Sequence, residues 1–447
     1  MFVKWQIRWT FSILISLYVM LSSSIKIYEA EVNEGSGDIK NVIFLIGDGM
    51  GISFTSGYRY FKDNPATFEL ESTEFGPYLV GQQTTYPNDP RHNVTDSAAS
   101  ATAMATGVKT YNGAIGIAND HTKLKSVLEA AKEKGKGTGL VATAQMTHGT
   151  PAAFGAHVDQ RKSMSAIADD YFDDLVNGKH KIDVLLGGGS EWFIRKDRNL
   201  VNEFVKDGYS YVTNVNEMNN DQSAQALGLF AKRGLPKMID RSNDIPSLAD
   251  MTTSAIERLN QNEKGFFLMV EGSQIDWAAH DNDIVGVMSE MEDFEKAFKV
   301  AIDFAKKDGL TLVIATADHS TGGFTIGAQG QYNWFSSVIK TVKRTPNYMA
   351  SEIVKGAGVK ETLTKYIEIP LTENEIRYVE RAARTLKARN IDNAIEEIIN
   401  NRSYTGWTTS GHTGEDVNVY AYGPGSERLR GQIDNTDHAK IIFDILR

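Results

Sequence analysis

Two patterns of hydrophobic positions alternate along this chain. Short, continuous apolar runs occupy residues 41–46, 139–142, 182–186, 266–270, 311–315 and 417–422. Such runs are typical of strands that are buried on both faces, as in a parallel-type sheet. Amphipathic stretches lie between these runs, at 125–134, 164–175, 247–259 and 285–307. The alternation predicts an α/β layered fold with helices on both faces of the sheet.

Acidic and imidazole side chains follow several of the predicted strands. Asp48, Glu271 and the pair Asp318–His319 each come directly after an apolar run. In sheets of this kind, chemistry gathers beyond the carboxyl ends of the strands. A buried carboxylate or imidazole is costly unless it is compensated, and a cluster of divalent metals would compensate all four side chains together.

Three further residues could bind a metal. Asp276 and His280 are four residues apart, a spacing that places them side by side on one helical turn and suits zinc. His412 lies between Gly411 and Gly414, where the backbone can approach closely. Taken alone, a surface ion pair accounts for Asp276 and His280, and a loop histidine without a role accounts for His412. Five other histidines sit among polar residues without acidic partners and are assigned no ligand role: His92, His121, His157, His180 and His438.

A serine precedes a run of small residues. Residues 98–106 predict a tightly packed helix, and Gly107 predicts its C-terminal stop. Ser97 would lie at the start of this helix, where free N–H groups and the helix dipole favour an anion. Either Asp96 or Ser97 could instead be an N-cap. A metal next to Ser97 would lower the pKa of its hydroxyl and make it a nucleophile.

Composition narrows these alternatives. With 447 residues and 41% hydrophobic content, the chain can form one large domain or two smaller ones. The absence of cysteine excludes thiolate zinc sites, cysteine nucleophiles and disulfides. A net charge of −10 argues against a nucleic-acid binder, so any phosphate recognition is expected to be local, inside one cleft.

Two segments lie outside the alternating region, namely the N-terminus and the residues at about 339–405. Lys4 and Arg8, an apolar stretch over 9–21 and three serines predict a signal peptide over 1–24, or to 30, and therefore an exported, periplasmic or secreted protein. An uncleaved membrane anchor is the alternative, but the stretch is short and serine-rich for a spanning helix. Residues 38–447 are expected to form a single domain. The charged, helical residues at about 339–405, including a predicted helix over 372–389, are interpreted as an insertion.

Six motifs together resemble the alkaline phosphatase family. They are Asp48-Gly49-Met50-Gly51, Thr95-Asp96-Ser97-Ala98-Ala99, Val270-Glu271-Gly272, Asp276-x-x-x-His280, Thr316-Ala317-Asp318-His319 and Gly411-His412-Thr413-Gly414, and they occur in the family's order from about Lys40 to the C-terminus. The resemblance implies a three-layer α/β sandwich with a mostly parallel central sheet. It also implies metal-dependent hydrolysis of small-molecule phosphomonoesters through a phosphoserine, with release of phosphate.

The resemblance implies roles for individual residues and two Zn²⁺ and one Mg²⁺ per chain. Ser97 would be the nucleophile, and Arg161 would grip the phosphate. One zinc site resembles Asp276, His280 and His412, the second resembles Asp48, Asp318 and His319, and the magnesium site resembles Asp48, Thr150 and Glu271, with His148 as a further candidate ligand.

Two residues depart from the pattern of the enteric bacterial enzymes. His148 stands where those enzymes have an aspartate, and Trp277 stands where they have a lysine. This pair resembles that of bacterial enzymes from cold marine settings. A neutral imidazole makes the third site less anionic, so weaker magnesium binding, or occupation by another metal, is expected there.

Two alternative functions remain open. A phosphodiesterase or sulfatase of the same superfamily would use similar metal ligands, although the former usually has threonine at the nucleophile position and the latter commonly a modifiable cysteine. An exported phosphate- or metal-binding protein without turnover would need only the ligands. Dimers predominate in the family, so a homodimer is expected, but monomers occur.

Overall fold

The structure is a computed structural model that describes residues 39–447. The predicted signal peptide lies outside the described residues. Among the helices of 39–447, none is both long enough and apolar enough to cross a membrane.

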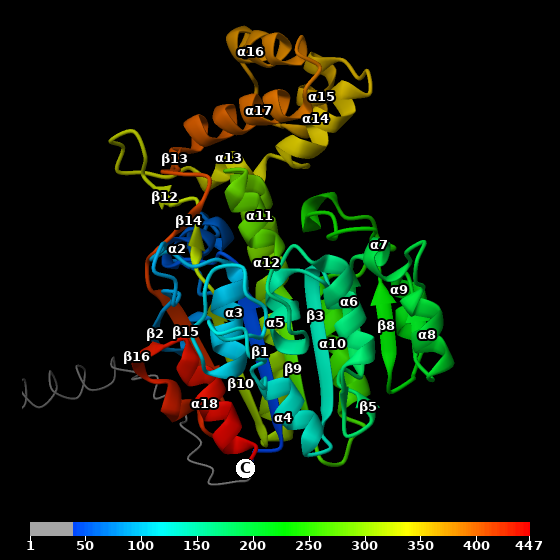
Figure 1. Ribbon diagram of the computed structural model, residues 1–447. Helices are drawn as coiled ribbons and strands as arrows, with labels where there is room; N and C mark the ends of the chain where they lie inside the picture. Colours follow the sequence, from blue (N-terminus) through cyan, green and yellow to red (C-terminus); the bar gives the residue numbers. More distant parts are fainter. Residues whose placement is uncertain (1–38) are drawn as a thin grey trace, which may run out of the picture. The chain divides into compact units, whose positions relative to one another are not determined.

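A ten-stranded sheet forms the centre of the structure (Figure 1). Its strands lie in the order β16-β2-β15-β10-β1-β9-β3-β6-β8-β7. Their bounds are β1 Asn41–Gly47, β2 Leu79–Thr84, β3 Gly137–Gln145, β6 Val184–Gly188, β7 Ser210–Val212, β8 Ala226–Leu229, β9 Phe266–Gly272, β10 Thr311–Ala317, β15 Val417–Tyr422 and β16 Gly431–Asp434. All six predicted strands are present, which confirms the mostly parallel α/β sheet.

Strand β15 departs from the direction of its neighbours. It pairs antiparallel with both β10 and β2, whereas the other pairings in the sheet are parallel. Its apolar residues Val417, Val419 and Tyr420 are nevertheless buried like those of the parallel strands. An apolar run reports burial on both faces and not strand direction, so the sequence pattern could not show this reversal.

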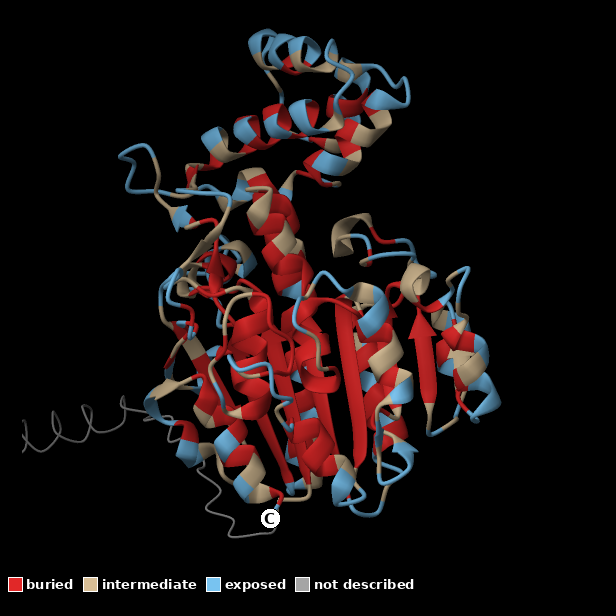
Figure 2. Ribbon diagram, viewed as in Figure 1, coloured by how far each residue is buried: buried red, intermediate tan, exposed pale blue. Residues whose placement is uncertain are grey.

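Helices cover both faces of the sheet, and the buried hydrophobic side chains form two separate clusters, one on each face. The strands at the centre of the sheet are buried, as their red colour in Figure 2 shows. Ile43 and Leu45 of β1 pack toward one face, and Phe44 and Ile46 pack toward the other. The first face carries α2 Ile52–Lys62, α10 Leu248–Leu259, α11 Gln274–His280 and α12 Ile284–Asp308. The second carries α3 Ser97–Thr106, α4 Val127–Glu133, α5 Gly149–Gly155, α6 Met164–Asp173, α7 Ser190–Phe193, α8 Leu200–Lys206 and α18 Thr436–Ile445. The three-layer α/β sandwich is therefore confirmed.

Short elements complete the described chain. They are the strand pairs β4 Leu175–Val176 with β5 Lys179–His180, β11 Ser320–Thr321 with β14 His412–Thr413, and β12 Thr325–Ile326 with β13 Thr405–Gly406, the helix α9 Val215–Asn220, and the 3-10 turns Gly76–Tyr78, Met238–Asp240 and Ser426–Leu429. The β11–β14 pair matters most for function, because it places His412 opposite Thr321, close to the carboxyl end of β10.

Five helices lie between β12 and β13. The last four fall within the segment interpreted as an insertion, and the first begins just before it. They are α13 Ser336–Lys340, α14 Pro346–Val354, α15 Val359–Tyr366, α16 Glu373–Ala383 and α17 Ala388–Ser403. The prediction of one helix over 372–389 is wrong. The chain leaves α16 after Ala383 and turns through Leu386, whose left-handed φ of 53° interrupts any continuous helix. A Thr372 capping box starts α16 as its sequence favours.

Helix α17 contacts the junction of α11 and α12. Arg389 forms an ion pair with Asp281, and the Asn400 amide donates to the Asn282 carbonyl at 3.0 Å. Glu396 is buried at this contact, and its Oε1 has no hydrogen-bond partner among the described residues. Burial, followed by the charges of neighbouring carboxylates, raises the pKa of Glu396 to about 10.

We expect Glu396→Gln to stabilise the protein in alkali. The pKa of Glu396 is higher in the folded protein than in the unfolded chain. The neutral carboxyl therefore contributes its full stabilisation at acidic pH. It is lost as pH rises toward 10. Glutamine stays neutral, so the variant should gain about 1–3 kcal/mol at pH 9.5 and little at pH 5. Thermal unfolding across this pH range measures the difference.

The exposed Glu380 of α16 provides the matched control, because Glu380→Gln removes the same charge in solvent. Its unfolding curve should shift equally at both pH values. A parallel pH dependence of wild type and Glu396→Gln would contradict the assignment of a neutral, buried carboxyl.

Candidate metal and phosphate site

The carboxyl ends of β1, β9 and β10 meet at one edge of the sheet, because the three strands are adjacent and parallel. Asp48 follows β1 directly and is followed by Gly49, whose φ is +70°. A side chain at Gly49 would also meet the Thr321 hydroxyl at 2.7 Å and an Asp276 carboxylate oxygen at 2.9 Å. Glycine is therefore required here by backbone conformation and by space, and it allows Asp48 and Asp276 to approach.

Asp318 and His319 turn into the same site because β10 has ended before them. Asp318 Oδ1 accepts hydrogen bonds from the backbone N–H groups of Gly49, at 3.0 Å, and of His319, at 2.9 Å. These bonds orient the carboxylate, and Oδ2 lies 3.1 Å from His319 Nε2. Adjacent residues within a strand point to opposite faces of the sheet. Asp318 and His319 can face one site because β10 ends before them.

His280 and His412 face each other through their Nε2 atoms. Their Nε2 atoms are 3.1 Å apart. The His280 Nδ1 lies 2.6 Å from the Ser410 carbonyl, and the His412 Nδ1 lies 2.9 Å from the Thr95 carbonyl. Carbonyls only accept hydrogen bonds, so each Nδ1 carries a hydrogen and each Nε2 presents a lone pair to the other.

Two lone pairs at this distance repel unless a cation or a proton lies between them. Asp276 Oδ2 is 3.3 Å from His280 Nε2, and Asp276 Oδ1 is 3.7 Å from His412 Nε2. Burial lowers the pKa of His280, but the hydrogen bond and charge of Asp276 outweigh it and raise the pKa to about 9. A proton is therefore held where these three side chains could hold a metal.

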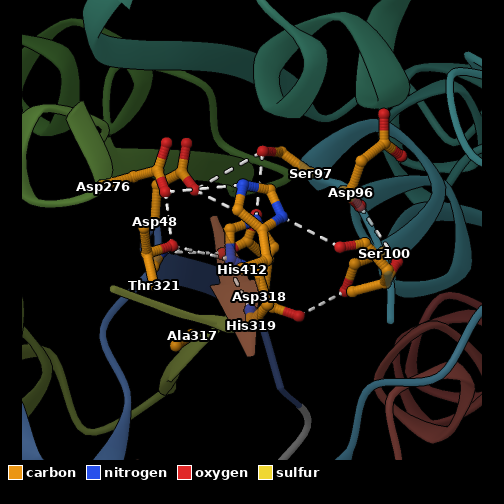
Figure 3. Close-up of polar contacts among 12 residues, drawn as sticks. Asp48, Asp96, Ser97, Ser100, Asp276, Ala317, Asp318, His319, Thr321 and His412 are labelled. Carbon is orange, nitrogen blue, oxygen red and sulfur yellow. Dashed lines mark hydrogen bonds and ion pairs between the residues drawn. The ribbon is translucent and has the colours of Figure 1, made fainter. Parts of the chain in front are cut away.

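Ser97 is the first residue of α3 and is almost fully buried. Its Oγ lies 3.2 Å from His319 Nε2 and 3.5 Å from Asp48 Oδ1, as Figure 3 shows. The N-cap is Asp96, which accepts from the Ala99 N–H at 3.0 Å. Of the two capping alternatives the structure selects Asp96, and the Ser97 hydroxyl stays directed at the acids and histidines.

A third group of ligand atoms lies on the other side of Asp48. Asp48 Oδ2, both Glu271 oxygens and the Thr150 hydroxyl are buried, and none has a hydrogen-bond partner within the described chain. Burial raises the pKa of Glu271 to about 7, and burial with neighbouring carboxylates raises the pKa of Asp48 well above its usual value. Buried, unpartnered oxygens of this kind fit a hard divalent cation.

Arg161 lies between Asp96 and His148. Its Nη1 donates to Asp96 Oδ2 at 3.0 Å, and its Nη2 contacts His148 Nε2 at 2.9 Å. The edge of Trp277 packs on the His148 ring, with centroids 5.5 Å apart. Asp96 therefore has two roles: it caps α3, as its sequence position allows, and it also holds Arg161, which the sequence pattern does not show.

The structure thus brings all eleven predicted site residues into one region. They are Asp48, Ser97, His148, Thr150, Arg161, Glu271, Asp276, His280, Asp318, His319 and His412. Two further residues, which no motif pointed to as part of the site, support this cluster. Thr321 donates to Asp276 Oδ1 at 2.5 Å, and Asp96 anchors Arg161.

The prediction that the other histidines lack acidic partners is wrong for four of them. His92 pairs with Asp89, His121 with Asp159, His157 with Glu129 and His180 with Asp207, at 2.8–3.1 Å. Three of these partners are far away in the sequence, so only folding brings them together. The fifth, His438, is buried and contacts Gln83.

The fold and this cluster define an enzyme of the three-layer α/β class, with a serine at the start of a helix beside acids and histidines. A family model described as alkaline phosphatase matches residues 39–447. The chain belongs to the alkaline phosphatase family, metal-dependent enzymes that hydrolyse phosphoric monoesters.

Curated relatives and solved structures agree with this family. The chain is 65% identical to alkaline phosphatase 3 of Bacillus subtilis (strain 168) over 421 residues, which cover 93% of this chain and 91% of the relative. It is 57% identical to alkaline phosphatase 4 of the same organism, covering 93% and 90%. The crystal structure of a cold-active alkaline phosphatase from the psychrophile Shewanella sp. is 39% identical, with a TM-score of 0.85 over 91% of this chain and 100% of that one.

Proposed function

We propose that this protein hydrolyses small-molecule phosphomonoesters through a covalent phosphoserine on Ser97. The observation that supports this proposal most directly is the position of the Ser97 hydroxyl. It lies within 3.5 Å of both Asp48 and His319, at the N-terminus of a ten-residue helix whose free N–H groups favour an anion. A protein that only bound phosphate would have no need of a buried hydroxyl in this place.

We propose three metal sites built from the ligand atoms described above. Asp276, His280 and His412 would hold one Zn²⁺, and Asp48, Asp318 and His319 would hold a second. Asp48, Thr150 and Glu271 would hold Mg²⁺. The fit rests on facing imidazole lone pairs in the first set and on unpartnered buried oxygens in the other two. When bound, such cations lower the pKa of a neighbouring hydroxyl and balance the negative charge of phosphoryl transfer.

The chain's own residues then carry out two successive displacements. Arg161 binds two phosphoryl oxygens through its planar guanidinium. Ser97 Oγ attacks phosphorus, its bond to phosphorus forms, and the bond to the alcohol oxygen breaks. A water then attacks the phosphoserine, which releases phosphate and returns the hydroxyl to Ser97. Two in-line steps predict net retention of configuration at phosphorus.

The remaining proposals concern the whole protein. We propose export after cleavage of residues 1–24, or to 30, a single domain over 38–447 with the insertion at about 339–405, and a homodimer, with a monomer as the alternative. Export without cysteine leaves metals and packing to stabilise the fold.

A comparison of two chromogenic esters tests the proposed reaction. We expect 4-nitrophenyl phosphate to be hydrolysed at least about a hundredfold faster, in kcat/KM, than bis(4-nitrophenyl) phosphate, because Arg161 and the cluster accommodate a doubly charged phosphoryl group. Initial rates at pH 9 with added zinc and magnesium give the ratio.

A sulfate monoester serves as the control for nonspecific hydrolysis and should be turned over slowly. Preference for the diester would indicate the phosphodiesterase alternative. Tight zinc and phosphate binding without hydrolysis of any ester would indicate a binding protein.

A further inference from the structure

His148 lies next to Arg161 and also among the proposed third-site ligands, but its neutral ring has only one nitrogen lone pair. Its Nε2 lies 2.9 Å from Arg161 Nη2. A guanidinium carries only N–H donors, so His148 must be the acceptor in this contact. The imidazole is therefore neutral, because a ring protonated on both nitrogens would have no lone pair to accept this hydrogen bond.

The same ring also belongs to the third group of ligands. A nitrogen of His148 and oxygens of Asp48 and Glu271 lie within 4.8 Å of one another, close enough to hold one cation. His148 Nδ1 is buried and has no hydrogen-bond partner within the described chain. The residue is therefore placed between Arg161 and the proposed magnesium site.

A neutral imidazole cannot serve both partners at once. One ring nitrogen carries a hydrogen, and the other has the only lone pair that can accept a hydrogen bond or bind a cation. While Arg161 donates to Nε2, the lone pair is occupied, whichever nitrogen faces the cation. A carboxylate at this position would be free of the conflict, because its two oxygens offer about four lone-pair sites.

We propose that His148 makes its contact with Arg161 and its coordination of a third-site cation mutually exclusive. This inference rests on the proposed phosphatase site. In the arrangement seen here, His148 is a positioning residue that holds the phosphate-binding arginine. It becomes a metal ligand only after Arg161 has moved away. Third-site occupancy is thereby linked to the position of Arg161, and by reciprocity each affects the other's free energy equally.

A double-mutant cycle on third-site affinity tests this exclusion. Proteins with two zinc ions bound are dialysed against buffered free zinc, and the third equivalent is measured by metal analysis. Arg161→Ala removes a nearby positive charge, which strengthens cation binding in any background. Only when His148 is present does it also release the lone pair. We expect Arg161→Ala to increase third-zinc affinity at least about tenfold more in wild type than in a His148→Ala background.

An equal increase in both backgrounds would overturn the proposal, because charge alone would then explain it. The comparison does not depend on turnover. Hydrolysis of 4-nitrophenyl phosphate by the same wild-type sample is measured separately. A catalytically inactive wild type with an intact cycle would contradict the proposed function and leave the exclusion standing.

The protonation pattern of the ring in wild-type protein provides a second measurement. In wild-type protein labelled with ¹⁵N-histidine, the His148 signals, assigned with His148→Ala, should show a hydrogen on Nδ1 and none on Nε2 before the third cation is added. Saturation with the third zinc should shift a ring nitrogen to the metal-bound range. Unchanged His148 signals with the third zinc bound would contradict the proposal.

Discussion

Replacing Ser97 by alanine should lower kcat about a thousandfold or more while the bound metals remain. The change removes one oxygen, and that oxygen lies 3.2 Å from His319 and 3.5 Å from Asp48. None of the proposed metal sites loses a protein carboxylate or imidazole. Loss of a nucleophile at an otherwise intact site typically costs several orders of magnitude, because only direct attack by water remains. Steady-state kinetics and metal analysis of the same sample measure both effects.

Thr106→Val is the matched control for this variant. Thr106 lies at the other end of α3, and its hydroxyl donates to the Thr102 carbonyl of its own helix, so the change removes a buried hydroxyl away from the cluster. Its kcat should remain within a few-fold of wild type. Acid quenching during turnover should trap phosphate on Ser97 in wild type and in Thr106→Val, and no phosphoenzyme should form in Ser97→Ala. A Ser97→Ala protein that keeps a tenth of the wild-type rate would rule out the serine as nucleophile.

Removal of metals should abolish hydrolysis and also destabilise the fold. Asp48, Glu271 and Asp318 all carry buried oxygens without hydrogen-bond partners in the described structure, and these oxygens repel one another when ionised. A cation present at about a thousandfold its Kd adds about 4 kcal/mol to stability. Chelation should therefore lower the Tm by several degrees, and zinc with magnesium should restore both Tm and rate. Calorimetry and ester hydrolysis before and after chelation measure these effects.

The pH dependence of metal retention has a defined sign. Without cations, the pKa of Glu271 rises to about 7 and that of His280 to about 9, so protons occupy ligand atoms of the cluster near neutral pH. Metals must displace these protons, and binding weakens as pH falls. Metal content after dialysis should decline between pH 8 and pH 5.

The metal-removal experiment also has two outcomes that would contradict the proposal. Full activity after complete zinc removal would show that the proposed chemistry is wrong, and restoration of activity by calcium alone would exclude the zinc assignment.

Much of the fold could be predicted because burial leaves a pattern along a strand or helix. β1, β9 and β10 are apolar at nearly every position, and α12 is amphipathic over its whole length. Strand β2 was missed because most of its residues are only partly buried or exposed, which leaves no apolar run. The split between α16 and α17 was missed because the left-handed turn at Leu386 has no glycine to announce it.

The sequence by itself predicted which residues gather in one region, since the six motifs contain eight of the eleven predicted site residues. The other three, His148, Thr150 and Arg161, lie outside the motifs. The sequence also determined an α/β fold and a hydrolase family. Only the tertiary structure decided which atoms of those residues are available. The carbonyls of Ser410 and Thr95 direct His280 and His412, and Arg161 occupies the lone pair of His148. The reason is physical: periodicity and motifs reflect local burial and chemistry, whereas these hydrogen bonds join residues 13, 130 and 317 positions apart and exist only after the chain has folded.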